Sequence, residues 1–217
     1  VFAAEAGSEP GAGDIVILYT NDVHCAVNQT VSDEVIEGIG YAGVAAYKKD
    51  MEELAGANNV TLVDAGDALQ GDAIGTLSQG QYLVDIMNQV GYDVFSPGNH
   101  EFDYGMDRMQ ELMKNLDATV VSSNFTDLRS NKLLYEPYTV VTYGEGEKAT
   151  KIAYLGITTP ESFTKSTPAY FQDDKGKYIF GFKEGNNGEE LYAAVQNAVN
   201  SARNAGADYV VALGHLG

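Results

Sequence analysis

Short apolar runs alternate with segments of helical periodicity along almost the whole chain, and this alternation limits the possible folds more than any other feature. Nearly continuous apolar runs of this length are typical of strands that are buried on both faces. They occupy residues 15–19, 60–63, 93–95, 118–121, 138–141, 151–155 and 208–213. Helical periodicity marks residues 41–54, 81–90, 106–116 and 189–204. The alternation predicts an α/β fold, with sheet inside and helices outside.

The chain has 217 residues, and a length in this range favours one domain. Residues 1–13 begin with small apolar residues and continue with Gly and Ser, which is typical of the region around an export cleavage site. An ordinary disordered N-terminus would look similar. We therefore expect a disordered segment or export remnant at residues 1–13, one folded domain at residues 14–217, and a periplasmic, cell-surface or extracellular location.

The charge of the chain excludes one class of partner. Its 31 acidic and 13 basic residues give a net charge of −18, which would repel DNA or RNA. A small phosphate ester could still bind if divalent metal ions supplied the missing positive charge. No apolar run approaches the roughly 20 residues of a membrane-spanning helix. The one cysteine, Cys25, allows neither an internal disulfide nor a thiolate zinc site.

All three histidines of the chain follow predicted strands within a few residues. His24, His100 and His215 come after the runs at 15–19, 93–95 and 208–213, and a fourth run, at 60–63, leads to Asp67. In open α/β sheets, ligands bind in the crevice beyond the carboxyl ends of the strands. We therefore expect these four segments to converge on one binding site.

Each of the four motifs has an ordinary structural explanation when it is taken alone, because Asn, Asp and Gly are also turn residues. Taken together, carboxylate, amide and imidazole groups after four successive strands form a pattern that suits a divalent metal ion. Asp103 lies close enough in sequence to hydrogen-bond a side chain of the third motif. The motifs are Asp22-Val23-His24, Gly66-Asp67, Gly98-Asn99-His100-Glu101 and Gly214-His215.

At these residues the chain resembles the calcineurin-like metallophosphoesterases and, within them, the 5′-nucleotidase family. The resemblance extends from about Asp14 to the last residue. The stretches that carry it most closely are Tyr19-Thr20-Asn21-Asp22-Val23-His24, Asp64-Ala65-Gly66-Asp67 with Gln70-Gly71, Pro97-Gly98-Asn99-His100-Glu101-Phe102-Asp103, Ser123-Asn124 and Gly156-Ile157-Thr158-Thr159-Pro160-Glu161.

The resemblance implies a ligand set for two divalent metal ions. Asp22 and His24 would hold the first metal, Asp67 would bridge both metals, and Asn99 and His215 would serve the second. The N and O ligands suit Mn, Zn, Fe or Co without selecting one of them. The fold that the resemblance implies is a calcineurin-like sandwich of two central β-sheets flanked by helices.

The resemblance also implies a catalytic pair and a longer protein. His100, held by Asp103, would be catalytic and would not bind a metal. In the family, a Gly-His-x-His segment with two further metal ligands and a separate nucleoside-binding domain follow the Gly-His motif. Neither is present after Gly217, so we expect the catalytic domain to be truncated at its C-terminus and its metal affinity and activity to be reduced.

The expected reaction is hydrolysis of a nucleotide phosphate monoester by a water that two metals activate. His100 would donate a proton to the leaving oxygen or stabilise its charge. One alternative keeps this chemistry but acts on a 2′,3′-cyclic nucleotide or a nucleotide-sugar pyrophosphate. An alternative of another class is a surface binding module without turnover, which would have no need for His100 and Asp103 together.

Overall fold

The computed structural model of the protein describes residues 9–216. Most of the segment expected at residues 1–13 therefore lies outside the described residues. Gly13 already contacts the domain, because its N–H donates to the carbonyl of Ala55 at 3.0 Å. Among the described residues, no helix is both long enough and apolar enough to cross a membrane.

Two sheets form the centre of the molecule. The first contains four parallel strands in the order β1 (Val16–Thr20), β4 (Val60–Asp64), β5 (Val94–Phe95) and β6 (Thr119–Val120). In the second, β10 (Thr150–Thr158) pairs in parallel with β12 (Tyr209–His215) and antiparallel with β9 (Tyr138–Tyr143).

The two sheets pack face to face through alternate side chains of their strands. Val63 on β4 and Tyr154 on β10 belong to one apolar cluster between the sheets. Their neighbours Leu62 and Leu155 point the other way, into the clusters beneath the helices. Because both faces of β4 and β10 are covered, these strands read as nearly continuous apolar runs in the sequence.

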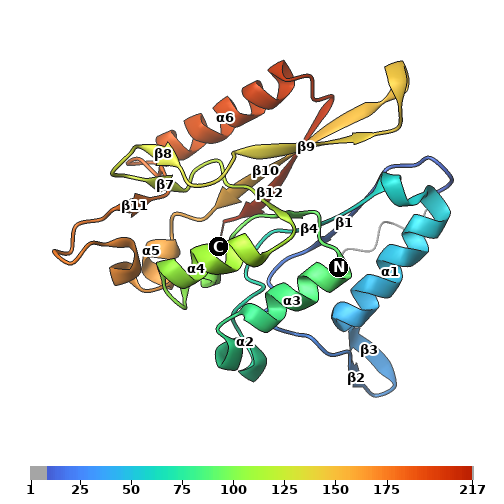
Figure 1. Cartoon of the computed structure of the whole chain (residues 1–217), viewed down its shortest axis with the longest axis horizontal. Coiled ribbons are helices and arrows are strands. Elements are labelled where there is room, and N and C mark those ends of the chain that lie inside the picture. The colour runs from blue at the N-terminus through green and yellow to red at the C-terminus, as the bar shows by residue number, and fades with distance from the viewer. Residues whose placement is uncertain (1–8, 217) are drawn as a thin grey trace.

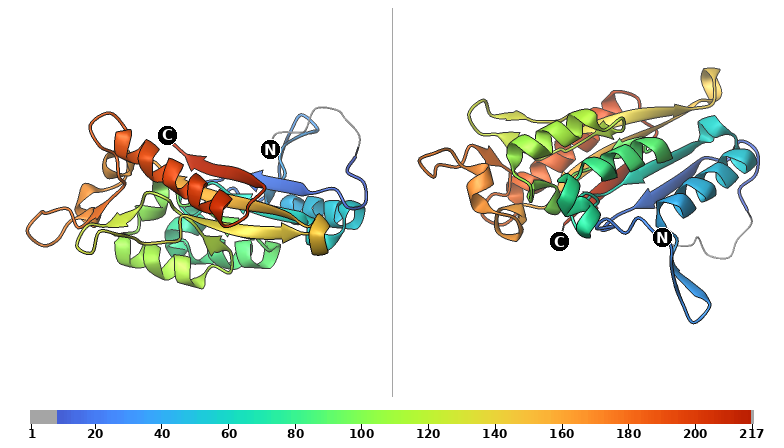
Figure 2. Two further views of the ribbon diagram at one scale, coloured as in Figure 1. Left: turned by 90° about the horizontal axis from the view of Figure 1, so that it is seen from above. Right: turned by 60° about the horizontal axis from the view of Figure 1, so that its bottom comes forward.

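Helices cover the outer faces of both sheets. The helices α1 (Gly40–Ala55), α3 (Gln81–Val90) and α4 (Met106–Asn115) lie on the side of the first sheet, and α6 (Glu189–Asn204) lies on the second. Figure 1 shows α6 on one side of β9, β10 and β12, with α1 and α3 on the opposite side of the molecule, and Figure 2 gives two further views of these layers. The predicted α/β sandwich of two sheets between helices is confirmed.

The strand pairing aligns the carboxyl ends of the strands at one edge. Thr20 at the end of β1 pairs with Asp64 at the end of β4, and Thr158 at the end of β10 pairs with His215. The strand expected at residues 208–213 therefore continues to His215, because its pairing with β10 continues that far. His215 is part of the strand and does not lie in a loop beyond it.

Several short elements have no counterpart in the sequence analysis. A two-stranded hairpin and a helix precede β5, and a small sheet in the order β11-β7-β8 lies beside α4 and α5. These elements are β2 (Thr30–Ser32), β3 (Val35–Gly38), α2 (Ala73–Ser78), β7 (Thr126–Asp127), β8 (Lys132–Leu133), α5 (Ser162–Lys165), β11 (Phe180–Gly181) and the 3-10 turns η1 (Ala57–Asn59), η2 (His100–Phe102), η3 (Gly146–Lys148) and η4 (Pro168–Phe171).

An aromatic cluster joins the segment of η2 to α5. The ring centroid of Phe102 lies 5.6 Å from that of Phe182, and the Phe163 ring lies 5.1 Å from the same Phe182 ring. Phe102 ends η2, and Phe163 belongs to α5. Edge-to-face aromatic pairs of this kind add to the free energy gained by burying the rings. The cluster therefore fixes η2 and α5 relative to each other.

Candidate metal centre

The loops that follow β1 and β4 lie side by side and are joined through their backbones. The Asp22 N–H donates to the carbonyl of Gly66 at 2.9 Å, and the His24 N–H donates to the carbonyl of Asp67 at 2.9 Å. Asp22, His24 and Asp67 all have positive φ, at 51°, 46° and 58°. Such values are uncommon outside Gly, and they cluster at functional sites where the surrounding structure maintains them.

Glycine lets a third loop approach these two. A Cβ atom on Gly66, which has φ +99°, would lie 2.3 Å from the backbone N of Gly98. No side chain can be accommodated at that distance, and the positive φ also favours glycine. Gly66 therefore brings the loop after β4 against the loop after β5, which carries Asn99 and His100.

His24 is oriented through the nitrogen that faces away from the other candidate ligands. Its Nδ1 donates to the carbonyl of Gln70 at 3.1 Å, which leaves the Nε2 lone pair free. Nε2 lies 3.8 Å from Asp22 Oδ1 and 3.8 Å from Asp67 Oδ2. One ligand atom from each of these three residues lies within 4.8 Å of the others. Metal-binding histidines commonly have this arrangement, in which a backbone carbonyl fixes the tautomer.

His215 repeats this arrangement on the other side of Asp67. Its Nδ1 donates to the carbonyl of Ala65 at 3.0 Å, while its Nε2 lies 3.1 Å from both Asn99 Oδ1 and Asp67 Oδ2. Burial lowers the pKa of His215, but the carboxylate of Asp67 outweighs this effect and raises the pKa to about 9. Three electron-rich atoms meet at one point here, so a positive charge, either a proton or a metal ion, stabilises the arrangement.

Asp67 lies between the two imidazoles. Its Oδ2 faces both histidines, and its Oδ1 accepts a hydrogen bond from the His100 N–H at 2.8 Å. Burial acts to raise the pKa of Asp67, but the hydrogen bonds from His215 and from the His100 backbone outweigh it, so the pKa is lowered. Asp67 is thus an ionised, buried carboxylate with one oxygen directed at two ring nitrogens.

Glu101 holds these loops together, and the sequence analysis gave it no role beyond its presence in the third motif. It is fully buried, and its carboxylate accepts the N–H groups of Gly98 at 2.7 Å and Asp67 at 2.8 Å. It also accepts those of Ala68 at 2.9 Å and Leu69 at 3.2 Å. Burial and the charge of Asp67 raise its pKa. In the sequence, the sign of this role is an acidic residue that directly follows Gly-Asn-His.

His100 and Asp103 form a separate pair at the rim of the centre. The His100 Nδ1 and Asp103 Oδ2 are 2.7 Å apart, within one short stretch of chain. The His100 ring lies edge-on to that of His24, with centroids 5.2 Å apart. Because Nδ1 is engaged by the carboxylate, Nε2 is the nitrogen available to a ligand.

One cavity of about 420 Å³ collects almost all the predicted site residues. All five predicted metal ligands and His100 line it, and Asp103 contacts it only through His100. The cavity falls within the range of small-molecule sites. The structure thus brings together residues that lie up to 193 positions apart in the sequence. The full lining is Asn21, Asp22, His24, Asp67, Asn99, His100, Lys165, Gly214, His215 and Leu216.

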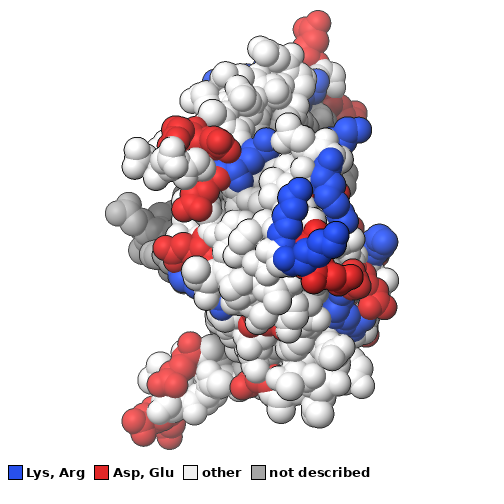
Figure 3. All heavy atoms as spheres, turned by 90° about the vertical axis from the view of Figure 1, so that its left-hand side faces the viewer, with Lys and Arg blue, Asp and Glu red and all other residues white. Residues whose placement is uncertain are grey.

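Charge is unevenly distributed over the rest of the surface. Figure 3 faces the end of the molecule where α5 and β11 lie in Figure 1, and it shows Lys and Arg gathered beside Asp and Glu. The overall acidity of the chain therefore does not extend evenly over this face.

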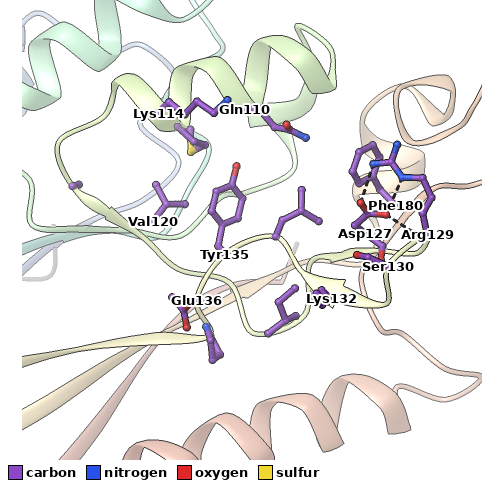
Figure 4. Close-up of a pocket in the computed structure, with 15 residues that line it drawn as sticks. Gln110, Lys114, Val120, Asp127, Arg129, Ser130, Lys132, Tyr135, Glu136 and Phe180 are labelled. Carbon is purple, nitrogen blue, oxygen red and sulfur yellow. Dashed lines mark hydrogen bonds and ion pairs between the residues drawn. The ribbon is translucent and has the colours of Figure 1, made fainter.

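A larger hollow of about 930 Å³ lies away from the cavity with the histidines. Figure 4 shows Tyr135 in it, between α4 and the β8 segment, with Asp127 and Arg129 paired beside Phe180. Its lining contains no histidine among the described residues, and Asp127 is already paired with Arg129. The larger hollow therefore lacks the chemistry of a metal centre, and we assign the candidate site to the smaller cavity.

Comparison with known proteins identifies the family of the chain. The sequence model of the calcineurin-like phosphoesterase family matches residues 15–217. The chain is 32% identical over 224 aligned positions to a snake venom 5′-nucleotidase from Gloydius brevicauda, covering 100% of this chain and 35% of that protein. It is 31% identical to the 5′-nucleotidase of Homo sapiens, covering 95% and 34%. The chain spans about a third of the length of these relatives.

Solved structures give the same result for the fold. A 5′-nucleotidase precursor from Thermus thermophilus superposes with a TM-score of 0.75 at 27% identity, covering 93% of this chain and 37% of the other. A calcineurin-like phosphoesterase from Bacillus subtilis superposes with a TM-score of 0.73 at 24% identity, covering 94% and 62%. The second similarity concerns the fold alone.

Proposed function

The chain belongs to the calcineurin-like phosphoesterase family, and we propose that it provides the catalytic centre of a 5′-nucleotidase, which releases phosphate from nucleotide monoesters. The observation that carries the proposal is the position of Asp67, whose Oδ2 faces His24 on one side and His215 on the other. The names of the relatives from Gloydius brevicauda and Homo sapiens support the choice of a nucleotide as substrate.

The residues fit a pair of divalent metal ions, as the family implies. Each histidine already uses Nδ1 to bind a backbone carbonyl and directs Nε2 towards Asp67, so both can act as neutral ligands. Asp22 and His24 would hold one ion, Asn99 and His215 the other, and Asp67 would serve both. Bound ions of Mn, Zn, Fe or Co would lower the pKa of a water and neutralise charge on the phosphoryl group.

His100 would handle the proton of the leaving group. Asp103 accepts the Nδ1 hydrogen at 2.7 Å, which fixes the orientation of the ring. Nε2 can then donate a hydrogen bond to the oxygen that leaves with the nucleoside. His100 is the first residue of η2, and the next residue, Glu101, accepts hydrogen bonds from four backbone N–H groups. These bonds fix the position of His100 relative to Asp67.

We place the nucleoside outside the cavity described above. The described residues that line that cavity are almost all polar, and their only aromatic rings are the three imidazoles. We propose that the nucleoside binds to a region that corresponds to the unmatched part of the longer relatives. We also propose an extracellular or cell-surface location, which the venom origin of the relative from Gloydius brevicauda supports.

Two substitutions test the proposal, with phosphate release from AMP in the presence of Mn²⁺ and metal content after dialysis as readouts. His100→Ala should lower kcat by about 100-fold or more while metal content stays unchanged. Asp67→Ala should lower metal content and activity together. A His100→Ala variant that lost metal in parallel with activity would contradict the role of His100. An Asp67→Ala variant that kept all its metal would contradict the role of Asp67.

A further inference from the structure

We propose that Lys165 binds the phosphoryl oxygens of the substrate from the side of the cavity that α5 forms. This inference rests on the proposed function, because it assigns a residue to the substrate of that same site. Lys165 is the last residue of α5 and lines the cavity together with the predicted metal ligands and His100. It is the only Lys or Arg among the described residues of that lining.

The charges in the cavity create a need for such a group. A phosphate monoester carries close to two negative charges at neutral pH. Asp22 and Asp67 already place two carboxylates in the same cavity, and the chain as a whole carries −18. Two divalent ions would bring four positive charges, of which these two carboxylates would offset two, so the remainder would only match the charge of the phosphate dianion. A flexible ammonium group with three donors, directed at oxygens that the ions do not contact, would complete the positive side of the site.

The aromatic cluster holds α5 in place beside the catalytic segment. Phe163, two residues before Lys165, packs on Phe182 with ring centroids 5.1 Å apart, and Phe102 packs on the same ring at 5.6 Å. Phe102 follows His100 by two residues. Lys165 and His100 are therefore supported by one aromatic cluster, although they lie 65 positions apart in the sequence.

Hydrogen bonds secure the chain that leads into α5. The fully buried Asn124 donates to the carbonyl of Thr158 at 2.7 Å and accepts from its N–H at 3.0 Å. The Ser162 hydroxyl donates to the carbonyl of Thr159 at 2.7 Å, and the Lys165 N–H donates to that of Glu161 at 2.8 Å. The start of α5 is thus fixed to the end of β10.

The Lys165 ammonium is paired in a way that a phosphate can replace. Its Nζ lies 3.1 Å from Oε2 of Glu161, the residue directly before α5. The Lys165 side chain is 40% exposed and that of Glu161 is 60% exposed. Exposed pairs of this kind contribute at most about 1 kcal/mol, so a doubly charged ligand can take over the lysine.

The test compares four variants of the chain by isothermal titration calorimetry with inorganic phosphate in the presence of Mn²⁺. The Mn²⁺ content of each variant is measured separately. Lys165→Gln removes the charge, Lys165→Arg retains it, and Glu161→Gln removes the competing carboxylate. Lys49→Gln is the matched control, because Lys49 forms the same i,i+4 pair with Glu53 on α1, far from the cavity lining.

We expect Lys165→Gln to weaken phosphate binding by about tenfold, the size of one charge-assisted hydrogen bond, with Mn²⁺ content unchanged. Lys165→Arg should restore most of the affinity, Glu161→Gln should bind phosphate at least as tightly as the unmodified chain, and Lys49→Gln should equal it. Phosphate binding in Lys165→Gln that equals that of Lys49→Gln would overturn the inference while leaving the proposed function intact. A chain that binds neither Mn²⁺ nor phosphate would overturn both.

Discussion

The two loops that carry the predicted ligands of the first metal differ from the segment that carries the catalytic pair. Asp22, His24 and Asp67 have positive φ, and the hydrogen bonds that keep them there come from other loops. Asn99 and Asp103 have ordinary helical φ, at −82° and −65°, and Asp103 binds His100 within one short turn. The ligand loops depend on long-range contacts, whereas the dyad forms locally.

The difference shows which part of the site is sensitive to substitution. Strained backbone persists only where the surrounding structure enforces it, so the ligand loops should couple metal binding to the stability of the whole domain. The dyad lies at the rim, with His100 32% exposed, and can change with little effect on folding. Substitutions in the two regions should therefore separate stability from catalysis.

The largest expected effect is that of Gly66→Ala in the ligand loops. The added Cβ would lie 2.3 Å from the Gly98 backbone nitrogen at a φ of +99°, so the loops after β4 and β5 must separate. We expect the free energy of unfolding to fall by more than about 4 kcal/mol in urea denaturation.

Gly146→Ala is the control for the backbone angle alone. Gly146 also has positive φ, at +64°, but nothing lies within 4 Å of its added Cβ. This variant should lose about 1 kcal/mol. Equal losses in the two variants would show that close packing of the loops contributes nothing.

Removal of Glu101 should have the next largest effect. Glu101→Ala would leave four buried N–H groups without an acceptor, including that of Asp67. We expect a loss of about 3 kcal/mol in the free energy of unfolding, together with weaker Mn²⁺ binding. Glu101→Gln keeps the shape of the side chain and one strong acceptor. Its free energy of unfolding should therefore lie between those of the unmodified chain and Glu101→Ala. A Glu101→Ala variant with unchanged Mn²⁺ affinity would contradict the positioning role.

The ion pair between His215 and Asp67 predicts a pH dependence in the metal-free chain. The folded-state pKa of His215 is raised to about 9, above the ordinary value of about 6.5, so its stabilising contribution is present below pH ~6.5 and is lost as pH rises through 9. We expect a loss of roughly 1–3 kcal/mol from this group between pH 6 and 10.

Urea denaturation in the presence of a chelator, compared with His215→Gln, isolates this contribution. The variant should lose less stability over the same pH range. Mn²⁺ binding should tighten over that range, because the metal competes with the proton on Nε2. A pH profile that is the same in the variant and in the unmodified chain would refute the ion pair.

The smallest effect on stability should come from Asp103→Asn in the dyad. The Asp103 side chain is 21% exposed and its contact with His100 is local, so we expect a change below about 0.5 kcal/mol in the free energy of unfolding. The kcat for AMP should fall by roughly 10- to 100-fold, because the ring would lose the carboxylate that accepts its Nδ1 hydrogen and orients it. A loss of stability as large as that of Glu101→Ala would show that the dyad is structural.

Much of the fold could be predicted because local signals coincide with its boundaries. The helices expected at 81–90 and 189–204 match α3 and α6 at both ends. Gly80 and Gly91, with φ of 84° and 80°, flank α3 and explain why its limits were readable. The end of β12 was harder to predict from the sequence. Its pairing with β10 extends the strand to His215, and no residue of β12 itself signals this end.

The parts that could not be predicted depend on contacts between distant segments. Glu101 gains its role from N–H groups some 30 residues earlier, which no local pattern reveals. The hairpin of β2 and β3 exposes Val31, Val35 and Ile36, so it has no alternation of buried and exposed residues to read. Convergence of the four motifs was predictable because three of them follow a strand and the fourth ends one, whereas the roles of their side chains as ligands remain predictions.

An anomalous diffraction map from crystals of the chain soaked in Mn²⁺ would show directly whether Asp67 serves two metal ions. We expect Mn²⁺ next to Asp67 Oδ2, contacting His24 Nε2 on one side or His215 Nε2 on the other, with two peaks at full occupancy. Manganese bound only at sites that touch neither oxygen of Asp67 would contradict it.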